Sequence, residues 1–118
     1  MSIKNALARV AVKDLRSAAL WYETMFGRPA DSRAMTEVAE WKFERGGWLQ
    51  VYQSTERAGS GSVTLAVSNL DEQVSALRKQ GIEVGPLIAG GGVKVVMVKD
   101  PDGNSIAFAE ASDPGLAQ

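Results

Sequence analysis

The sequence contains no cysteine and no histidine among its 118 residues. Without cysteine the chain cannot form a disulfide, use a thiolate as a nucleophile or bind zinc through sulfur. Without histidine it lacks the commonest metal ligand and the commonest general base at neutral pH. These two absences remove more chemistry than any motif in the sequence supports.

Long apolar runs and clusters of one charge are also missing. No stretch approaches the roughly 18 consecutive apolar residues of a membrane span, and the first residues lack the apolar segment of a secretory signal, so we expect a cytoplasmic protein. Thirteen basic and fourteen acidic residues give a net charge of −1 without a basic cluster. We therefore expect neither a nucleic acid nor a membrane as partner.

The most informative positive feature is an internal repeat. Residues 8–15 (ARVAVKDL) return as residues 63–70 (VTLAVSNL), with the same apolar alternation, polar turn and final leucine. A repeat this short within a chain of one-domain length predicts two halves of one pseudosymmetric core. We therefore expect a single domain over 1–118, made of modules at about 6–53 and 62–110 that are joined by a polar linker at 54–61.

Hydrophobic periodicity and turn residues divide each module into a strand, a helix and three further strands. The predicted fold class is therefore α+β, with two βαβββ modules. The first module is expected to have strands at 7–12, about 30–35, 37–44 and 48–53, and a helix at 16–26. The second is expected to have strands at 62–67, 82–87, 93–98 and 105–109, and a helix at 70–80.

Glycine, proline and aspartate mark the ends of these elements. Gly27 and Gly81 are predicted to end the two helices, and glycine pairs or triplets at 46–47 and 90–92 are predicted turns. The segment DPDGN at 100–104 is also a predicted turn, in which Gly103 takes a positive φ. Its two aspartates are interpreted as turn residues rather than as a catalytic pair. Residues 112–118 are typical of a disordered end.

The repeated βαβββ pattern, Asp14-Leu15 after the first strand, Trp21-Tyr22 before Phe26-Gly27 and DPDGNSI at 100–106 together resemble the vicinal oxygen chelate superfamily. That superfamily includes glyoxalase I, extradiol dioxygenases, fosfomycin-resistance enzymes and bleomycin-resistance proteins. The resemblance covers about residues 7–110. It implies paired modules that form curled mixed sheets, commonly assembled as a homodimer with pockets inside the curl.

In metal-dependent members of the superfamily, one side chain from the first and one from the last strand of each module hold the metal. Matched to this sequence, those positions are Leu7, Gln50, Ser62 and Ala107. Leu7 and Ala107 have no ligating atom, and Ser62 is a poor ligand, whereas tight binding needs about three or four good donors. Glu110 lies an odd number of residues beyond the last position and so points to the opposite face. We therefore expect no metal and no cofactor.

Strand alternation predicts which side chains line the concave face instead. They mix aromatic surface, small residues and a few hydrogen-bonding groups, a composition typical of pockets for organic ligands. Trp48 and Tyr52 would serve equally well to fill the curl or an interface between subunits, and Gln50 to make a structural hydrogen bond. The candidate ligand pocket consists of Arg9, Trp48, Gln50, Tyr52, Ser62, Thr64 and Ala107.

Arg9 is the most informative charge of this set. An interior arginine needs a partner, and an ion pair with Glu37 or Glu40 is favoured over an acidic ligand. The other aromatic residues of the first module are interpreted as packing residues of the core or of an interface: Trp21, Tyr22, Trp41 and Phe43.

A retained scaffold without metal ligands predicts a metal-free protein that binds a small molecule, resembling the bleomycin-resistance type that sequesters a drug or metabolite. The alternative is a glyoxalase-like lyase or isomerase of unknown substrate, metal-independent or with an atypical metal site. In that enzyme Glu37 or Glu40 would act as base, and Arg9 or Tyr52 would stabilise developing negative charge. A third possibility is a module whose own side chains fill the pocket.

Overall fold

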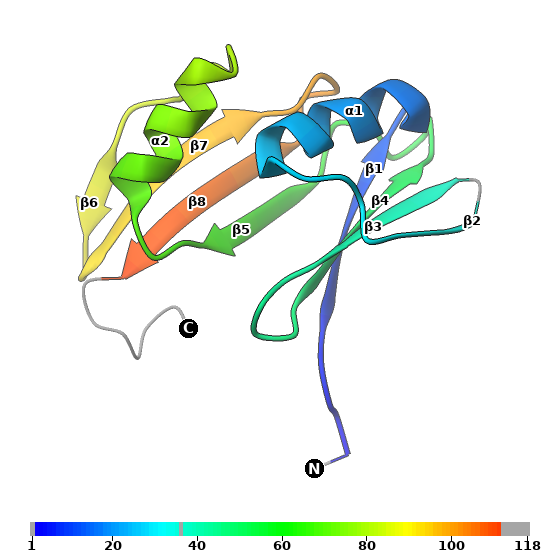
Figure 1. Ribbon diagram of the computed structural model, residues 1–118, viewed down its shortest axis with the longest axis horizontal. Helices are drawn as coiled ribbons and strands as arrows, with labels where there is room; N and C mark the ends of the chain where they lie inside the picture. The colour runs from blue at the N-terminus through cyan, green and yellow to red at the C-terminus, as the bar shows by residue number, and fades with distance from the viewer. Residues whose placement is uncertain (1, 36, 112–118) are drawn as a thin grey trace.

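The computed structural model describes residues 2–35 and 37–111, which form eight strands and two helices (Figure 1). The α+β class and the duplicated βαβββ order are both confirmed. In the first module the strand order across the sheet is β1-β4-β3-β2, with β1 parallel to β4 and the other pairs antiparallel. Its elements are β1 (Leu7–Val12), α1 (Leu15–Phe26), β2 (Ser32–Met35), β3 (Val38–Lys42) and β4 (Trp48–Gln53).

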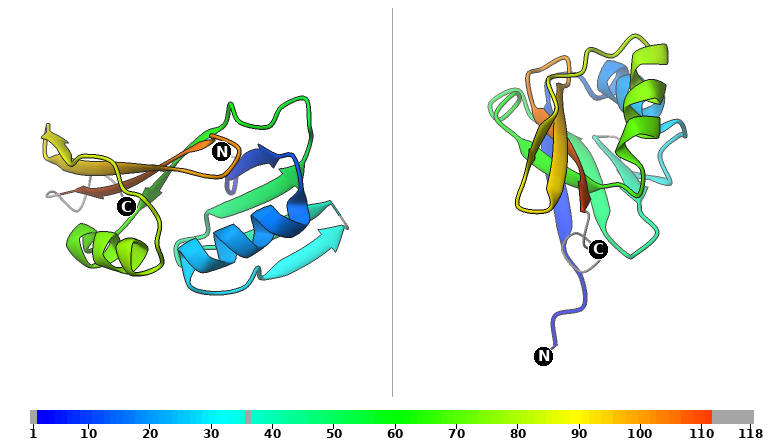
Figure 2. Two further views of the ribbon diagram at one scale, coloured as in Figure 1. Left: turned by 90° about the horizontal axis from the view of Figure 1, so that it is seen from above. Right: turned by 90° about the vertical axis from the view of Figure 1, so that its left-hand side faces the viewer.

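The second module repeats this topology. Its sheet has the order β5-β8-β7-β6, again with one parallel pair, β5 with β8. Figure 2 shows the two modules side by side, each with its own helix, and β1 contacts β5 where they meet. The elements are β5 (Ser62–Ala66), α2 (Leu70–Lys79), β6 (Ile88–Gly90), β7 (Val93–Lys99) and β8 (Ser105–Ala111).

Both helices begin and end through local side-chain chemistry. The Asp14 carboxylate accepts a hydrogen bond from the backbone N–H of Ser17, so α1 begins one residue earlier than the sequence predicts. Asn69 caps α2 in the same way, through the N–H of Glu72. Gly27 ends α1 at φ 74°, a left-handed conformation that costs glycine little. The described helices include none that is long and apolar enough to cross a membrane.

One predicted strand is wrong. Residues 82–87 form no strand, and β6 lies at 88–90 instead. Ile82 turns into the core directly after Gly81, which has φ 78°. Gly85 donates a 2.9 Å hydrogen bond to the carbonyl oxygen of Met97, but Pro86 has no N–H with which to continue a ladder. The apolar residues of this segment therefore anchor a loop beside β7.

Aromatic rings form much of the core of the first module. Tyr22 and Trp41 are completely buried. Their burial agrees with the sequence-based interpretation that they are packing residues. Five rings from α1, β3 and the turn after β3 contact one another, with centroids 5.0 to 6.2 Å apart. Aromatic pairs at such distances add stabilisation beyond the area that they bury. The cluster consists of Trp21, Tyr22, Phe26, Trp41 and Phe43.

The turn at 100–104 ties the two modules together. The Asp100 carboxylate accepts the backbone N–H groups of Asp102 and Asn104, which confirms its role as a turn residue, and Gly103 has φ 97°. Asn104 is fully buried, and its amide donates 2.8 Å hydrogen bonds to the carbonyl oxygen of Ala11 in β1 and to Asp100. Its Oδ1 accepts from the N–H groups at positions 59 and 61 of the linker. The linker is therefore held against both modules.

Candidate functional site

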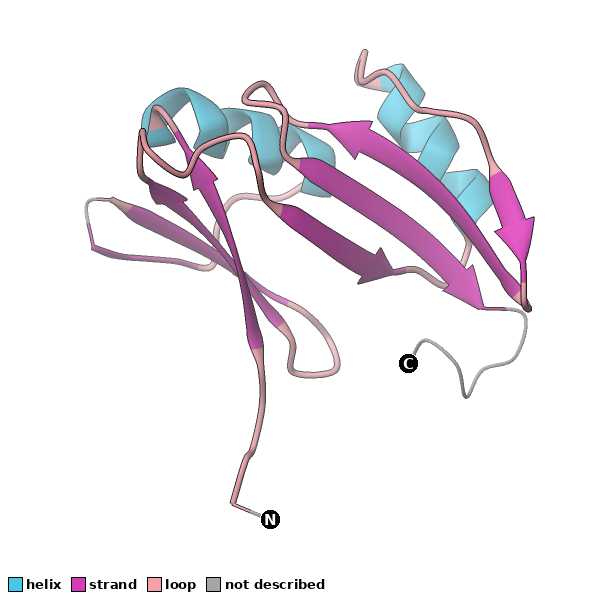
Figure 3. Ribbon diagram, turned by 180° about the vertical axis from the view of Figure 1, so that it is seen from behind, coloured by secondary structure: helices cyan, strands magenta, loops and turns pink. Residues whose placement is uncertain are grey.

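Each sheet packs one face on its helix and leaves the other face without one. In β4 the two alternate residues Leu49 and Val51 are completely buried on the helix side, whereas Trp48, Gln50 and Tyr52 are half-buried on the opposite side. Figure 3 shows the second sheet from the side that α2 does not cover. We refer to these two surfaces as the open faces of the first and second sheets.

The open face of the first sheet carries a polar pair at its centre. Arg9, Gln50 and Glu40 are direct neighbours across β1, β4 and β3. The side-chain amide of Gln50 donates a 2.6 Å hydrogen bond to Oε2 of Glu40. Glu40 as a residue is only 7% exposed. Because a carboxylate accepts and does not donate, the amide nitrogen of Gln50 must face Glu40 and its Oε1 must face away.

Two cations lean over aromatic rings on either side of this pair. The guanidinium carbon of Arg9 lies 4.0 Å from the centroid of the Tyr52 ring, and Nζ of Lys42 lies 4.5 Å from that of Trp48. Both rings belong to β4: Trp48 lies two residues before Gln50, and Tyr52 lies two residues after it. Cation–π attraction thus fixes one guanidinium and one ammonium group on this face.

The predicted ion pair between Arg9 and Glu37 or Glu40 is wrong. Within 2–35 and 37–111 the ion pairs are Arg28–Asp31 and Lys94–Glu110. Gln50 stands between Arg9 and Glu40 in the sheet and occupies the carboxylate itself. Arg9 is also exposed, so its charge remains hydrated and a stacked tyrosine suffices as its neighbour.

The remaining predicted pocket residues lie on the second sheet. Ser62 and Thr64 of β5 are exposed, while Ala107 of β8 is 6% exposed and directly neighbours Thr64. Met97 lies beside Ala107 on the other side and is 42% exposed. The structure therefore brings Arg9, Trp48, Gln50 and Tyr52 together on one sheet and places the small residues on the other.

The four positions implied for a metal do not fit one. Leu7 is 50% exposed and neighbours Trp48, so the residue directly beside Gln50 is Arg9 rather than Leu7. In the described part of the chain no three acidic side chains are grouped closely enough to hold a metal ion. Glu110 faces the helix side, where it accepts a 2.6 Å hydrogen bond from the N–H of Leu70 at the start of α2.

Lys42 is the functional candidate that the sequence interpretation missed, and Glu40 was considered only as a partner or base. Ala39 and Trp41 are completely buried, so their neighbours in β3 must point to the open face. The same alternation in the sequence VAEWK would have placed Glu40 and Lys42 together on the face opposite the buried Ala39 and Trp41.

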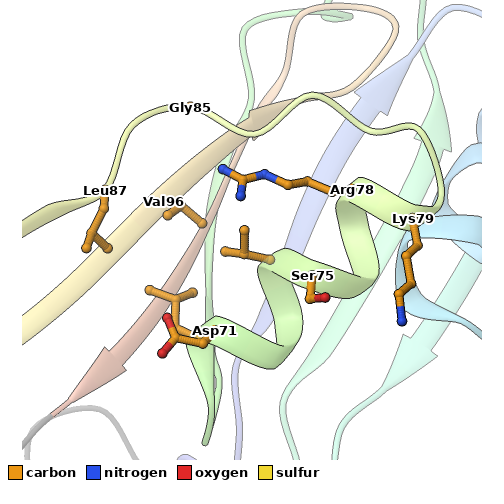
Figure 4. A pocket seen from close by; sticks show the side chains of 9 residues that line it. Asp71, Ser75, Arg78, Lys79, Gly85, Leu87 and Val96 are labelled. Atoms are coloured by element: carbon orange, nitrogen blue, oxygen red, sulfur yellow. The ribbon is translucent and has the colours of Figure 1, made fainter.

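A groove lies on the helix side of the second sheet. It is an open groove of about 540 Å³ between α2, the loop before β6, and β7 (Figure 4). Arg78 points from α2 across it toward β7, whereas Lys79 points away. Its apolar part comes from Val74, Leu87 and Val96. This groove contains none of the predicted pocket residues.

The sequence matches no protein-family model and no curated protein. Solved structures do resemble it. A glyoxalase/bleomycin resistance protein from Catenulispora acidiphila is 34% identical with a TM-score of 0.84, over 92% of this chain and 99% of that one. A lactoylglutathione lyase from Agrobacterium tumefaciens is 20% identical with a TM-score of 0.77, over 95% and 96% of the two chains. The oxidase ChaP-H2 is 14% identical with a TM-score of 0.78, over 96% and 100%.

Proposed function

Because the chain belongs to the vicinal oxygen chelate superfamily, as its similarity to a glyoxalase/bleomycin resistance protein shows, we propose that it is a metal-free binding protein for a small organic molecule. In this proposal it acts in the cytoplasm and sequesters a drug or metabolite stoichiometrically, without turnover. The ligand would contact Arg9, Trp48, Gln50 and Tyr52, with Ser62, Thr64 and Ala107 providing space opposite them.

The observation that carries the proposal is the open face of the first sheet. Its aromatic rings are half-buried and fixed by cations, and its one buried carboxylate is satisfied by Gln50. A surface of ordered rings with a few oriented polar groups is typical of sites for organic ligands. The donor chemistry supports binding rather than metal catalysis, since Leu7 and Ala107 offer no ligating atom.

We propose further that the site is completed in a homodimer. The open face of the first sheet has large side chains such as Trp48 and Tyr52, whereas that of the second sheet has small ones such as Thr64 and Ala107. Surfaces of these two kinds would pack against each other around a ligand. Met97, exposed on the second face, would then lie in the interface.

The assembly can be tested by analytical ultracentrifugation of Met97→Glu. The introduced charge should raise the dimer dissociation constant, because it would be buried in the interface. Leu20→Glu is the matched control: Leu20 is a 62% exposed apolar residue on α1, away from both open faces. A monomeric wild type, or equal dissociation of both variants, would contradict the proposed interface.

Ligand binding can be tested through Trp48. The first sheet carries Trp41 in β3 and Trp48 in β4. Trp41 is completely buried in the core, so of these two only Trp48 can respond to direct contact with a ligand. We expect saturable quenching when a broad panel of aromatic compounds is titrated. With Trp48→Phe the quenching should disappear while calorimetry still detects binding. Absence of binding to any compound in both measurements would refute the proposed function.

One observation favours a second function, a lyase or isomerase without a metal. Glu40 is a nearly buried carboxylate that is bonded to a neutral amide, and Arg9 lies on the same face. Such a carboxylate could remove a proton while the guanidinium stabilises negative charge. The compounds that bind can be followed by NMR in the presence of protein. Chemical change that Glu40→Gln abolishes without loss of binding would favour the enzyme.

A further inference from the structure

We propose that the site on the first sheet selects planar aromatic anions, with aromatic carboxylates as the ligand class, and that Arg9 and Lys42 determine this specificity. The inference deepens the proposed binding function and rests on it. It follows from three features of the open face: two cations without anionic partners, a nearly buried carboxylate that is hydrogen-bonded to Gln50, and an oriented amide oxygen.

Neither cation forms an ion pair with an acidic side chain in the part of the chain that the structure describes. Arg9 and Lys42 each contact an aromatic ring, and the recorded ion pairs involve neither of them. The backbone N–H of Lys42, not its ammonium group, donates a hydrogen bond to the carboxylate of Asp31. That carboxylate is already bonded to Arg28 at 2.6 Å. The N–H donors of Arg9 and Lys42 are therefore available to a ligand.

Glu40 does not cancel this positive charge at the surface. Its carboxylate is nearly buried and accepts a 2.6 Å hydrogen bond from Gln50, whereas Arg9 and Lys42 are both exposed. Of these three charged side chains, the two that are exposed are cations. A cationic ligand would meet like charges, and a neutral one would leave the two groups unpaired, so an anion is favoured.

The arrangement on β4 also favours a planar ligand. Arg9 leans from β1 onto Tyr52, Lys42 leans from β3 onto Trp48, and Gln50 lies between the two rings. Trp48 and Tyr52 are four residues apart on β4, about 13 Å, and each lies about 7 Å along the strand from Gln50. One or two fused aromatic rings therefore cover the span between Gln50 and either ring. A guanidinium stacked on one ring readily accepts a second planar group on its other face.

Gln50 adds a preference within this class. Since its amide nitrogen is bonded to Glu40, its Oε1 faces away from the carboxylate and can accept a hydrogen bond from the ligand. An aromatic acid that also carries a hydroxyl would satisfy one of the cations and this oxygen together. Arg9 or Lys42 would bind the carboxylate, and Gln50 would accept a hydrogen bond from the hydroxyl.

The test uses three probes with one carbon skeleton: 2-naphthoate, 2-naphthamide and 2-naphthylmethylammonium. Isothermal titration calorimetry of the wild-type protein should give 2-naphthoate at least about tenfold tighter binding than the other two, the effect expected of one charge-assisted contact. Added salt should weaken the binding of the naphthoate and not of the amide.

Two variants locate the effect. At least one of Arg9→Gln and Lys42→Gln should weaken naphthoate binding about three- to tenfold, and each should weaken the binding of naphthamide by a smaller factor, since the amide loses only the stacking contact. Arg16→Gln, which removes an exposed cation from α1, is the matched control and should change neither. Because both variants could also perturb the sheet, the salt dependence of the wild type gives an independent reading.

The outcomes separate the inference from the function on which it rests. Equal or tighter binding of the amide or the ammonium probe would overturn the anion preference while small-molecule binding stands. Failure of all three probes would also overturn it, whichever other compound quenches Trp48. Only failure of the whole aromatic panel would refute the binding function itself.

Discussion

The phenolic oxygen of Tyr22 on α1 donates a 2.6 Å hydrogen bond to Oδ2 of Asp100 in the turn before β8. The two residues belong to different modules and are 78 positions apart. Burial, and after it the bond to Asp100, holds the pKa of Tyr22 well above its ordinary value of 10.0, so the hydroxyl stays a donor. Each half of the duplication thus supplies one member of a buried polar link.

Tyr22→Phe should destabilise the protein by about 1–3 kcal/mol, because the buried Oδ2 of Asp100 loses one of its two donors and keeps only the Asn104 amide, while the ring still fills the core. Urea unfolding followed by circular dichroism measures the change. Tyr52→Phe is the control: no hydrogen bond of its hydroxyl is recorded among the described residues, and it lies on an open face. Equal losses for both variants would argue against the link.

Asn104→Ala should be more damaging, with a loss of about 3 kcal/mol or more, since the change orphans several buried groups at once. Those groups are the carbonyl of Ala11, the Asp100 carboxylate and two N–H groups of the linker. Asn5→Ala removes an exposed asparagine that bonds to Gly46 and should cost much less. Thermal unfolding compares the two, and a similar shift for both would contradict the buried network.

Gly59→Ala should destabilise by more than about 2 kcal/mol, because it combines a strained backbone with a steric clash. Gly59 has φ 95°, and an added Cβ would lie 2.6 Å from the carbonyl oxygen of Asp102. Gly90→Ala is the control, since a Cβ there meets nothing within 4 Å and φ is not positive. Denaturant midpoints measured on both variants check the prediction, which fails if they match.

Asp31 should contribute to stability in a pH-dependent way. A hydrogen bond from Arg28, and then one from the backbone of Lys42, lowers its pKa below the ordinary 3.8. The contribution is therefore complete above about pH 4 and is lost as the pH falls through the lower value in the folded state. Asp31→Asn should be less stable than the wild type at neutral pH and should approach it in acid. Glu56→Gln, an exposed linker change, should show no such convergence in pH-dependent melts.

Much of the fold could be predicted from local signals. The boundaries of β1 and β4 agree with the prediction, because apolar alternation and glycine turns coincide there. The segment at 82–87 misled because Ile82, Val84 and Leu87 have the composition of a strand, whereas Gly81 and Pro86 fix its path as a loop. Composition alone does not distinguish the two. The expectation for 112–118 lies outside the described residues.

The candidate site was harder to predict because its contacts cross strands. Alternation correctly indicated that Arg9, Gln50 and Tyr52 share a face, but the partner of Arg9 depends on the pairing register. That register places Gln50 between Arg9 and Glu40, so opposite charges that look suited to each other do not meet. Pairings of this kind are settled by the whole sheet rather than by sequence spacing.

The aromatic cluster has a consequence for how unfolding of the chain can be observed. All three tryptophans and both tyrosines belong to the first module, and Phe108 is the one aromatic residue of the second. Intrinsic fluorescence therefore reports the melting of one half of the duplication, whereas far-ultraviolet circular dichroism reports both halves. Coincident transitions by the two signals would show that the modules unfold as one cooperative unit.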